Sequence, residues 1–336
     1  MPLLLSRHLV AQLLEPIQLL QDLRIAFSDY QGPMRDSRRV RAPLHDQGTA
    51  VVLLPGRTPS VPAYTVKVHA KFPSEPLAIQ GVILLYDLAD GRLLAVIDST
   101  YITAVRTALV GALAADVLAP IGAHRVAVIG AGVQGEFQLR FLRHVRPISQ
   151  VAIYDINPTR SEALRRRAVQ EFGIDARVGS SIADVTTEAE MIVTATWARA
   201  PFLDVEHLTD AVHVTSLGSD EPGKVEVTRR LCEQSVLVCD DRSLALSTGV
   251  IGSLSLDPAG NQAELGEIIA GKRPGRVYQS QRTLFCPTGL PFQDLVAAWQ
   301  VYQKALRYGG VPEFDFLARS DARLLSPERR LSHDRP

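Results

Sequence analysis

The stretch Val126-Ala127-Val128-Ile129-Gly130-Ala131-Gly132-Val133-Gln134-Gly135 decides the fold of this chain. It begins with an apolar run that predicts a buried strand and continues with the spacing Gly-x-Gly-x-x-Gly. A helix that starts in such a loop points its free N–H groups at a pyrophosphate. We expect Gly130 to make the tight turn, Gly132 to let the backbone approach the phosphates, and Gly135 to let the helix pack on the strand. Val133 and Gln134 complete the predicted cofactor loop.

The residues after this motif favour NAD over NADP. The run Val151–Tyr154 predicts a second strand, which ends at Asp155, about 20 residues beyond Gly135, the usual place of the acid that binds the ribose hydroxyls. A carboxylate there repels a 2′-phosphate, although Arg160 lies close enough to complicate this preference.

Around this motif, apolar runs alternate with helical stretches, which predicts βαβ units and a parallel sheet. A helix is expected at about 134–145, and the expected strands are 126–129, 151–154, 191–195, 212–216 and 236–239.

The part before the motif is different in character. Ala89-Asp90-Gly91 predicts a hairpin turn between the runs Ile79–Asp87 and Leu93–Asp98, and 50–54 and 63–68 are further strand candidates. We expect residues 1–23 to form one amphipathic helix, with Leu9, Leu13, Ile17 and Leu20 on one face, and two more helices at 103–118 and 292–308.

These patterns predict an α/β chain of two domains. A strand-rich α+β domain for substrate binding and dimerisation comprises 1–118, completed by 289–318. A Rossmann-type parallel-sheet domain comprises 119–288, and 319–336 is expected to be a mobile tail.

Composition disfavours several classes of protein. Lys plus Arg and Asp plus Glu number 36 each, so a basic face for nucleic acid is not expected. We expect no membrane span and no signal peptide, and hence a cytoplasmic protein. Cys232, Cys239 and Cys286 have no metal-ligand spacing, so no metal is expected.

Three polar residues are candidates for chemistry. Arg106 lies on an otherwise apolar helix, where a guanidinium suits capture of a carboxylate; its alternative is a surface position. Lys67, in an apolar strand, could bind a carboxylate or move a proton, or face water at a sheet edge. Asp220 follows the strand run 212–216 at its carboxyl end, where α/β sheets place ligands, or it is a turn residue.

The chain resembles the ornithine cyclodeaminase/μ-crystallin family over roughly residues 35–308. The resemblance rests on Lys67 with Pro73, on Asp98 to Thr107, on the glycine loop, on Leu217 to Lys224, and on Ala263 to Ile269.

The resemblance implies roles for several residues. Arg41 and Arg106 would clamp the substrate carboxylate, Lys67 would lie in the substrate site, and Asp220 would be the acid–base residue. Thr107 and Thr194 are expected beside the cofactor. A homodimer paired through the strand-rich domain is also implied.

Two positions depart from the family's pattern. Ornithine cyclodeaminases carry a Glu that holds the distal amine, and here Val52 stands at that place. The familiar Asn after the Pro is replaced by Glu75. A valine cannot pair with an ammonium group, so a less basic or more apolar substrate than ornithine is expected.

The predicted function is therefore an NAD-dependent oxidation of the amine carbon of a small L-amino acid to an imine, with internal cyclisation and release of ammonia. The alternative is a simple amino-acid dehydrogenase or an imine or ketimine reductase with net turnover of NAD(H). A μ-crystallin-like binding protein is a further alternative, against which the retention of Lys67, Arg106 and Asp220 argues.

Overall fold

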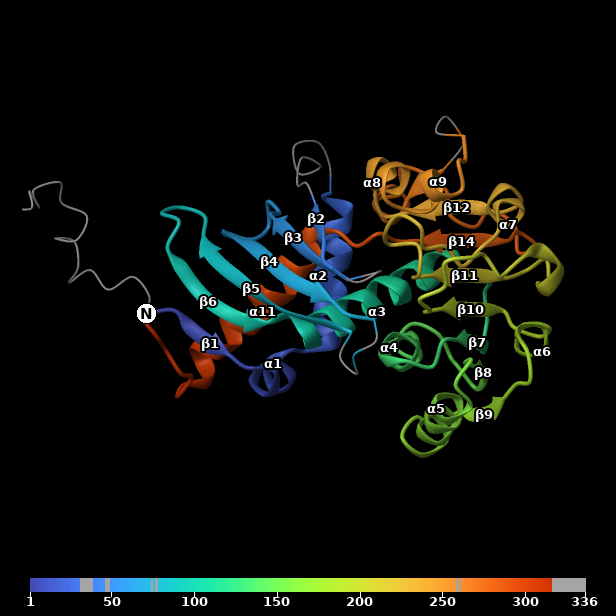
Figure 1. Ribbon diagram of the computed structural model, residues 1–336, viewed down its shortest axis with the longest axis horizontal. Coiled ribbons are helices and arrows are strands. Elements are labelled where there is room, and N and C mark those ends of the chain that lie inside the picture. The colour runs from blue at the N-terminus through green and yellow to red at the C-terminus, as the bar shows by residue number, and fades with distance from the viewer. Residues whose placement is uncertain are drawn as a thin grey trace, which may run out of the picture.

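Two sheets organise the chain, with the long helix α3 (Ser99–Leu118) running between them (Figure 1). The computed structural model describes residues 1–30, 39–45, 49–73, 75, 78–257, 260 and 262–315. The predicted tail, 319–336, lies outside the described residues. The predicted combination of a parallel Rossmann-type sheet with a strand-rich α+β unit is confirmed.

The first sheet, sheet A, has the strand order β1-β6-β5-β4-β3-β2. The hairpin between β5 and β6 is formed as predicted, and only β1 pairs in parallel, with β6. Helices α3 and α11 (Pro291–Tyr308) pack on one face of this sheet, and α2 (Pro16–Ser28) packs against these two helices. Its strands are β1 (Leu3–Leu5), β2 (Val40–Pro43), β3 (Ala50–Gly56), β4 (Ala63–Lys71), β5 (Ile79–Asp87) and β6 (Leu93–Asp98).

The prediction of one helix over residues 1–23 is wrong. The chain forms β1, then α1 (Arg7–Leu13), then α2, with extended backbone at Leu14 and Glu15. Pro16 explains the break, because proline lacks an N–H and disfavours helical backbone in the residue before it. The register of the buried face consequently changes, and α2 buries Leu19 and Leu23 while Ile17 is 47% exposed.

The second sheet, sheet B, is parallel, in the order β13-β12-β14-β11-β10-β7-β8-β9. Strand β7 (Arg125–Ile129) lies between β8 (Gln150–Tyr154) and β10 (Met191–Thr194), so the chain reverses its direction of winding at β7. Ligands of such sheets bind at this reversal, beyond the carboxyl ends of the strands. The remaining strands are β9 (Asp175–Val178), β11 (His213–Ser216), β12 (Val236–Cys239), β13 (Ala263–Glu264) and β14 (Thr283–Cys286).

The helices of this half are short beyond the first two. They are α4 (Val133–Leu142), α5 (Pro158–Gln170), α6 (Ile182–Thr186), η2 (Val205–His207), α7 (Arg229–Glu233), α8 (Arg242–Ser247), α9 (Val250–Ser253) and α10 (Leu265–Ile269). All strands from β7 to β14 belong to sheet B, whereas α11 returns to pack on β3, β4 and β5. The domain boundaries themselves stay a prediction.

Helix α3 is the centre of the packing. Asp98 caps it by accepting hydrogen bonds from the backbone N–H groups of Thr100 (3.1 Å) and Tyr101 (3.3 Å). Among the described residues it is the one helix long and apolar enough to cross a membrane, and 78% of that apolar window is buried inside the structure. Burial on nearly all sides explains its composition of Ala, Leu and Val.

Candidate active site

A cavity of about 640 Å³ lies between the two sheets. Strand β4, helix α3, the start of α4 and the loops that follow β10, β11 and β14 all contribute to its wall. The cavity therefore joins the predicted cofactor loop to the predicted substrate residues. Its wall includes Thr107, Ala131, Gly132, Val133 and Gln134 at one end and Lys67, Arg106 and Asp220 at the other.

The three glycines of the loop have the geometry expected of them. Gly130 has φ +97°, and a Cβ atom there would lie 2.6 Å from the carbonyl oxygen of Ala195. A Cβ atom on Gly135 would overlap the carbonyl oxygen of Gly130, so the helix packs closely on the strand. A Cβ atom on Gly132 would meet nothing within 4 Å, and Gly132 lines the cavity. Gly130 and Gly135 thus shape the loop from behind, and Gly132 faces the space that a pyrophosphate needs.

Asp155 stands at the head of this loop. Its carboxylate accepts hydrogen bonds from the backbone N–H groups of Ala131 (2.7 Å) and Asn157 (2.8 Å). The side chain is half-buried, and Arg160 lines the cavity nearby. Asp155 itself does not line the cavity, so its contact with the ribose hydroxyls of NAD stays a prediction.

A buried ion-pair triad lies at the substrate end. The ammonium of Lys67, on β4, donates to Asp294 (3.0 Å) and Thr103 (2.7 Å). The guanidinium of Arg106, on α3, donates from Nε to the same Asp294 oxygen (3.1 Å) and from Nη1 to Gln293 (2.8 Å). Burial lowers the pKa of Lys67 to about 8, although Asp294 opposes this.

One carboxylate therefore orients two cations at the cavity wall. The other oxygen of Asp294 and the side-chain nitrogen of Gln293 are buried without a hydrogen-bond partner in the described part of the chain. Such atoms are costly unless a ligand or water satisfies them.

The loop after β14 is held against Arg106. Asp240 accepts hydrogen bonds from the backbone N–H groups of Thr288 (3.0 Å) and Gly289 (2.6 Å). Burial raises the pKa of Asp240. Gly289 has φ +89°, and a Cβ atom there would lie 3.2 Å from Nη1 of Arg106. Both the backbone conformation and the close approach therefore require glycine at this position.

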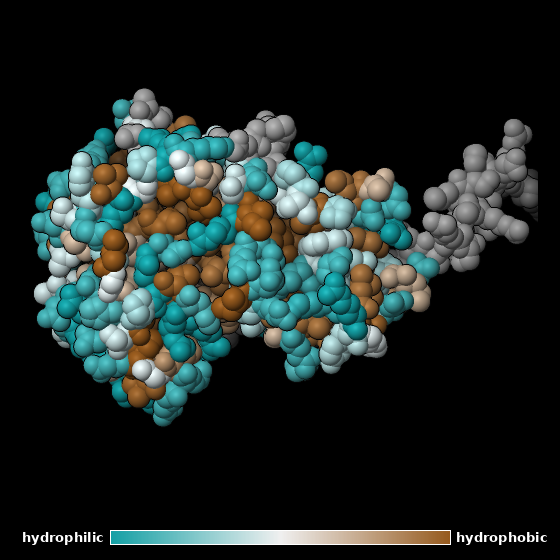
Figure 2. All heavy atoms as spheres, turned by 180° about the vertical axis from the view of Figure 1, so that it is seen from behind, coloured by the Kyte–Doolittle hydropathy of each residue, from teal (hydrophilic) through white to brown (hydrophobic). Residues whose placement is uncertain are grey.

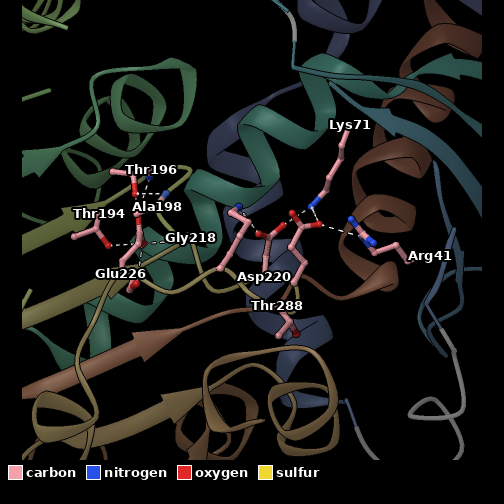
Figure 3. A network of polar contacts seen from close by, with 12 residues as sticks. Arg41, Lys71, Thr194, Thr196, Ala198, Gly218, Asp220, Glu226 and Thr288 are labelled. Atoms are coloured by element: carbon pink, nitrogen blue, oxygen red, sulfur yellow. Dashed lines mark hydrogen bonds and ion pairs between the residues drawn. The ribbon is translucent and has the colours of Figure 1, made fainter. Parts of the chain in front are cut away.

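Asp220 lies in a second charged network, shown in Figure 3. Its two carboxylate oxygens accept from the ammonium groups of Lys71 (2.7 Å) and Lys224 (2.8 Å). Burial alone would raise the pKa of Asp220, but Lys71, Lys224 and Arg39 outweigh it and hold the pKa well below its usual range. Glu221 pairs with Lys71 and with Arg41, each at 3.3 Å. Asp220 is consequently a permanent negative charge at neutral pH.

The structure corrects the expectation for Arg41. It pairs with Glu221 and does not line the cavity, whereas Arg39 does. The guanidinium of Arg39 donates to the backbone oxygens of Asp220 (2.8 Å) and Thr288 (3.2 Å). The two residues lie next to each other on the same edge of sheet A, and sequence position alone does not distinguish them.

Val52 and Thr194 also lie behind the cavity wall and not in it. Val52 is fully buried on β3, opposite His69 of β4. The hydroxyl of Thr194 donates to Glu226 (2.6 Å). Glu226 also accepts from Ser216, from the backbone N–H of Gly218, and from the backbone and hydroxyl of Thr196, at 2.6–2.8 Å. This fully buried carboxylate ties the ends of β10 and β11 together (Figure 3).

Sequence reasoning missed the run of polar residues along β4. Lys67, His69 and Lys71 alternate with Val66, Val68 and Ala70, so all three face the cavity. Burial and the neighbouring cations lower the pKa of His69 to about 2, and its Nδ1 is buried without a partner in the described part of the chain. A period of two in polar residues was the available signal. Asp294, Gln293, Glu226 and Lys224 carried no comparable local signal.

The described residues include no group of three or more His, Cys, Asp or Glu side chains that could hold a metal ion. Cys232, Cys239 and Cys286 are free and buried, and burial raises the pKa of each thiol.

Comparisons with known proteins agree with this geometry. The model of the ornithine cyclodeaminase/mu-crystallin family matches residues 2–309. The alanine dehydrogenase of Archaeoglobus fulgidus is 33% identical over an alignment of 258 residues, and the match covers 72% of this chain and 76% of that protein.

Two solved structures have the same fold. The Delta(1)-pyrroline-2-carboxylate reductase of Thermococcus litoralis, in complex with NADH and L-proline, superposes with a TM-score of 0.88 at 27% identity, over 93% of this chain and 100% of that one. An archaeal alanine dehydrogenase dimer with bound NAD superposes with a TM-score of 0.86 at 27% identity, over 94% and 99%.

Proposed function

The chain belongs to the ornithine cyclodeaminase/mu-crystallin family, and on that premise we propose that it is an NAD-dependent imine reductase or amino-acid dehydrogenase with net turnover of the cofactor. The observation that carries the proposal is one shared cavity, whose wall contains both the glycine loop and Lys67, Arg106 and Asp220. In the reductive direction an imine, NADH and a proton give an amino acid and NAD.

The residues at the glycine loop fit this cofactor, as Gly132 and Asp155 indicate. When bound, NAD supplies the hydride acceptor, and NADH the donor. Arg106, fixed by Asp294 and Gln293, presents its guanidinium to the substrate carboxylate. Arg39 replaces Arg41 as the second cation of this clamp.

Lys67 and Asp220 have complementary roles in the proposal. A lysine with a pKa of about 8 is mostly protonated at neutral pH and releases its proton readily, so Lys67 supplies the proton that the reduced imine takes up. Asp220 stays ionised and holds the ammonium groups of Lys71 and Lys224 at the cavity wall. Lys67 is thus the proton donor of the proposal, and Asp220 positions the neighbouring lysines.

Cyclisation with release of ammonia is the second candidate, and the presence of Asp220 favours it. Two observations weigh against it. Val52 is buried behind the wall, and both oxygens of Asp220 are engaged by lysines. A distal amine would therefore enter a region that is already positively charged.

Turnover assays separate these candidates. The protein is mixed with NADH and Δ1-pyrroline-2-carboxylate, or with NADH, pyruvate and ammonia, and loss of NADH absorbance is followed. In parallel, NAD is mixed with L-proline, L-alanine or L-ornithine, and NADH and ammonia are both measured. Net NADH change supports the proposal. Ammonia release from L-ornithine without net NADH would establish the cyclodeaminase instead.

Arg106→Gln provides the residue-level test, with Arg125→Gln as its matched control. Arg125 pairs with Glu190 at the amino end of β7, the end away from the cavity. We expect Arg106→Gln to raise the KM for the imine by at least about tenfold, because a charge-assisted contact is lost. Arg125→Gln should leave it unchanged. Equal effects of both changes would contradict the assigned role.

The outer face of sheet A supports a homodimer. Leu53, Val68 and Val82 lie side by side across β3, β4 and β5, and Leu53 and Val82 are exposed by 37% and 39%. Pro55, Val66 and Leu84 form the next row. An apolar sheet face of this kind is typical of a subunit interface. We therefore propose that two copies pair through it.

Light scattering on the eluting protein tests the dimer. The wild-type chain should have twice its monomer mass, and Val82→Glu should have the monomer mass. A wild-type monomer would refute the pairing. A cytoplasmic location is also proposed, with the three buried free thiols as its support.

A further inference from the structure

The substrate end of the cavity holds more positive charge than a simple amino acid requires. Lys67 and Arg106 share the carboxylate of Asp294, and Lys71 and Lys224 share that of Asp220. Glu221 is divided between Lys71 and Arg41. Five cations therefore line this end, with three carboxylates in contact with them in the described part of the chain. The five are Arg39, Lys67, Lys71, Arg106 and Lys224.

The other acidic residues that line the cavity do not restore the balance. Glu75 also lines the cavity but is exposed to water. Glu136 lies at the cofactor end, where it pairs with Arg140 and Arg167. Unbalanced buried cations are unfavourable until an anion joins them.

We propose that the substrate carries a second carboxylate on its side chain, so that it is an amino- or imino-dicarboxylic acid, and that Lys71 with Arg39 binds this group. The α-carboxylate binds to Arg106. The side-chain carboxylate binds to Lys71 and Arg39 on the opposite part of the wall. The reaction assigned to such a substrate rests on the proposed function, whereas its binding does not.

Lys71 is well placed for this role. It is the last residue of β4, its side chain is only 2% exposed, and its ammonium points toward Asp220 and Glu221 (Figure 3). It lies two residues from His69 and four from Lys67 on the same face of the strand, so the three side chains are neighbours along one wall. A ligand carboxylate reaching Lys71 would also meet Lys224 across Asp220.

Arg39 provides a second, independent observation. Its Nη1 atom donates to two backbone carbonyl oxygens. In the described part of the chain, Arg39 forms no ion pair with a carboxylate. Its Nε atom is buried and has no hydrogen-bond partner there. A planar guanidinium with a donor to spare suits a carboxylate.

The same arrangement disfavours a diamino acid. A distal ammonium would approach Lys71, Lys224 and Arg39 instead of a free carboxylate. Val52, which lies opposite His69 on the neighbouring strand, supplies no carboxylate to bind such an ammonium. Side-chain charge is therefore the property that this site discriminates, with an acidic group favoured over a neutral or basic one.

Binding to the NADH complex tests the inference without any turnover. Succinate and butyrate have the same carbon chain and differ by one carboxylate, so titration calorimetry of each compares the two groups directly. We expect succinate to bind at least about tenfold more tightly, as a hydrogen-bonded charge pair supplies. Lys71→Gln should reduce this preference to about threefold or less, and Lys71→Arg should restore most of it.

Arg41→Gln is the matched control. Arg41 contacts Glu221 at the same 3.3 Å as Lys71 but does not line the cavity. The succinate preference should survive in Arg41→Gln, and its loss there would assign the effect to the network and not to Lys71. If Lys71→Gln does not fold, Arg39→Gln carries the same expectation. Equal binding of succinate and butyrate to the wild-type complex would overturn the inference.

Kinetics extend the test to the reaction. NADH oxidation is compared for oxaloacetate with ammonia and for 2-oxobutyrate with ammonia, with ammonia-free mixtures as blanks. The ratio of the two kcat/KM values should be at least about tenfold and should fall in Lys71→Gln. A succinate preference without any NADH oxidation would leave the inference standing and remove the proposed reaction. Reduction of both imines with equal kcat/KM would support the proposed reaction and overturn the inference.

Discussion

Removing the carboxylate of Asp294 should move the alkaline limit of activity toward neutral pH. Asp294 is buried and lies 3.0 Å from the ammonium of Lys67. At an effective dielectric constant of about 20, two charges at this distance attract by about 5 kcal/mol. Asp294→Asn keeps an acceptor oxygen but removes this attraction, while repulsion from Arg106 remains.

The sign of the effect follows from the charges. Asp294 raises the pKa of Lys67, so its loss lowers that pKa from about 8. Because the proposed function takes the proton for imine reduction from Lys67, kcat/KM for the wild-type enzyme should fall above about pH 8. In the variant this fall should begin at least about one pH unit lower, since one unit corresponds to about 1.4 kcal/mol. The difference in kcat/KM between the variant and the wild type should become smaller as the pH is lowered.

The assay is the pH profile of kcat/KM for Δ1-pyrroline-2-carboxylate with saturating NADH. Asp204→Asn is the control, because Asp204 pairs with Arg230 away from the cavity. If the alkaline fall of kcat/KM occurs at the same pH in Asp294→Asn as in the wild type, or at a higher pH, Lys67 is not the titrating group.

Three further predictions concern the cofactor loop, the cofactor preference and the core of sheet B. Gly132→Ala should fold with normal stability, because its Cβ would meet nothing, yet bind NAD at least about tenfold more weakly by calorimetry; unchanged affinity would contradict the loop assignment. Asp155→Ser should narrow the ratio of kcat/KM for NADH over NADPH, and a ratio that stays the same would show that Asp155 does not select the cofactor. Burial lowers the pKa of His213 to about 3, so its contribution to stability is complete above about pH 6.5 and declines as the pH falls toward 3. Between pH 6.5 and 4, the free energy of unfolding measured with urea should therefore fall less in His213→Gln than in the wild type, by up to about 3 kcal/mol. An equal fall in both proteins would contradict this account.

The cofactor half of the site was readable from the sequence because its determinants are local. A strand, a glycine-rich turn and a helix follow one another within residues 125–142. Gly130 is required by its own φ, and Gly135 by the carbonyl group of Gly130. Strand β14 was not predicted. Its four residues become a strand through pairing with β11 and β12, which lie far away in the sequence.

The substrate half depends on contacts between distant segments. Lys67 and Arg106 were identified from their apolar surroundings, but Asp294, which orients both, is an ordinary first-turn acid of a helix when read locally. Whether Arg39 or Arg41 enters the cavity depends on how the edge of sheet A lies against the loop after β11. No local pattern contains that information.

Helix α3 limits how this architecture can be rearranged. Arg106 meets α11 on the substrate side, and the carbonyl oxygen of the next residue, Thr107, accepts a hydrogen bond from Gln138 of α4 on the cofactor side (3.2 Å). Consecutive residues of one rigid helix thus set the spacing between the two ligands. In a chimera that replaces only residues 119–288 with a foreign cofactor domain, the contact between that domain and α3 would not match. If α3 were replaced as well, the substrate wall would change, because Arg106 belongs to α3. Exchange of cofactor specificity in this scaffold is therefore better sought through loop substitutions than through recombination of whole domains.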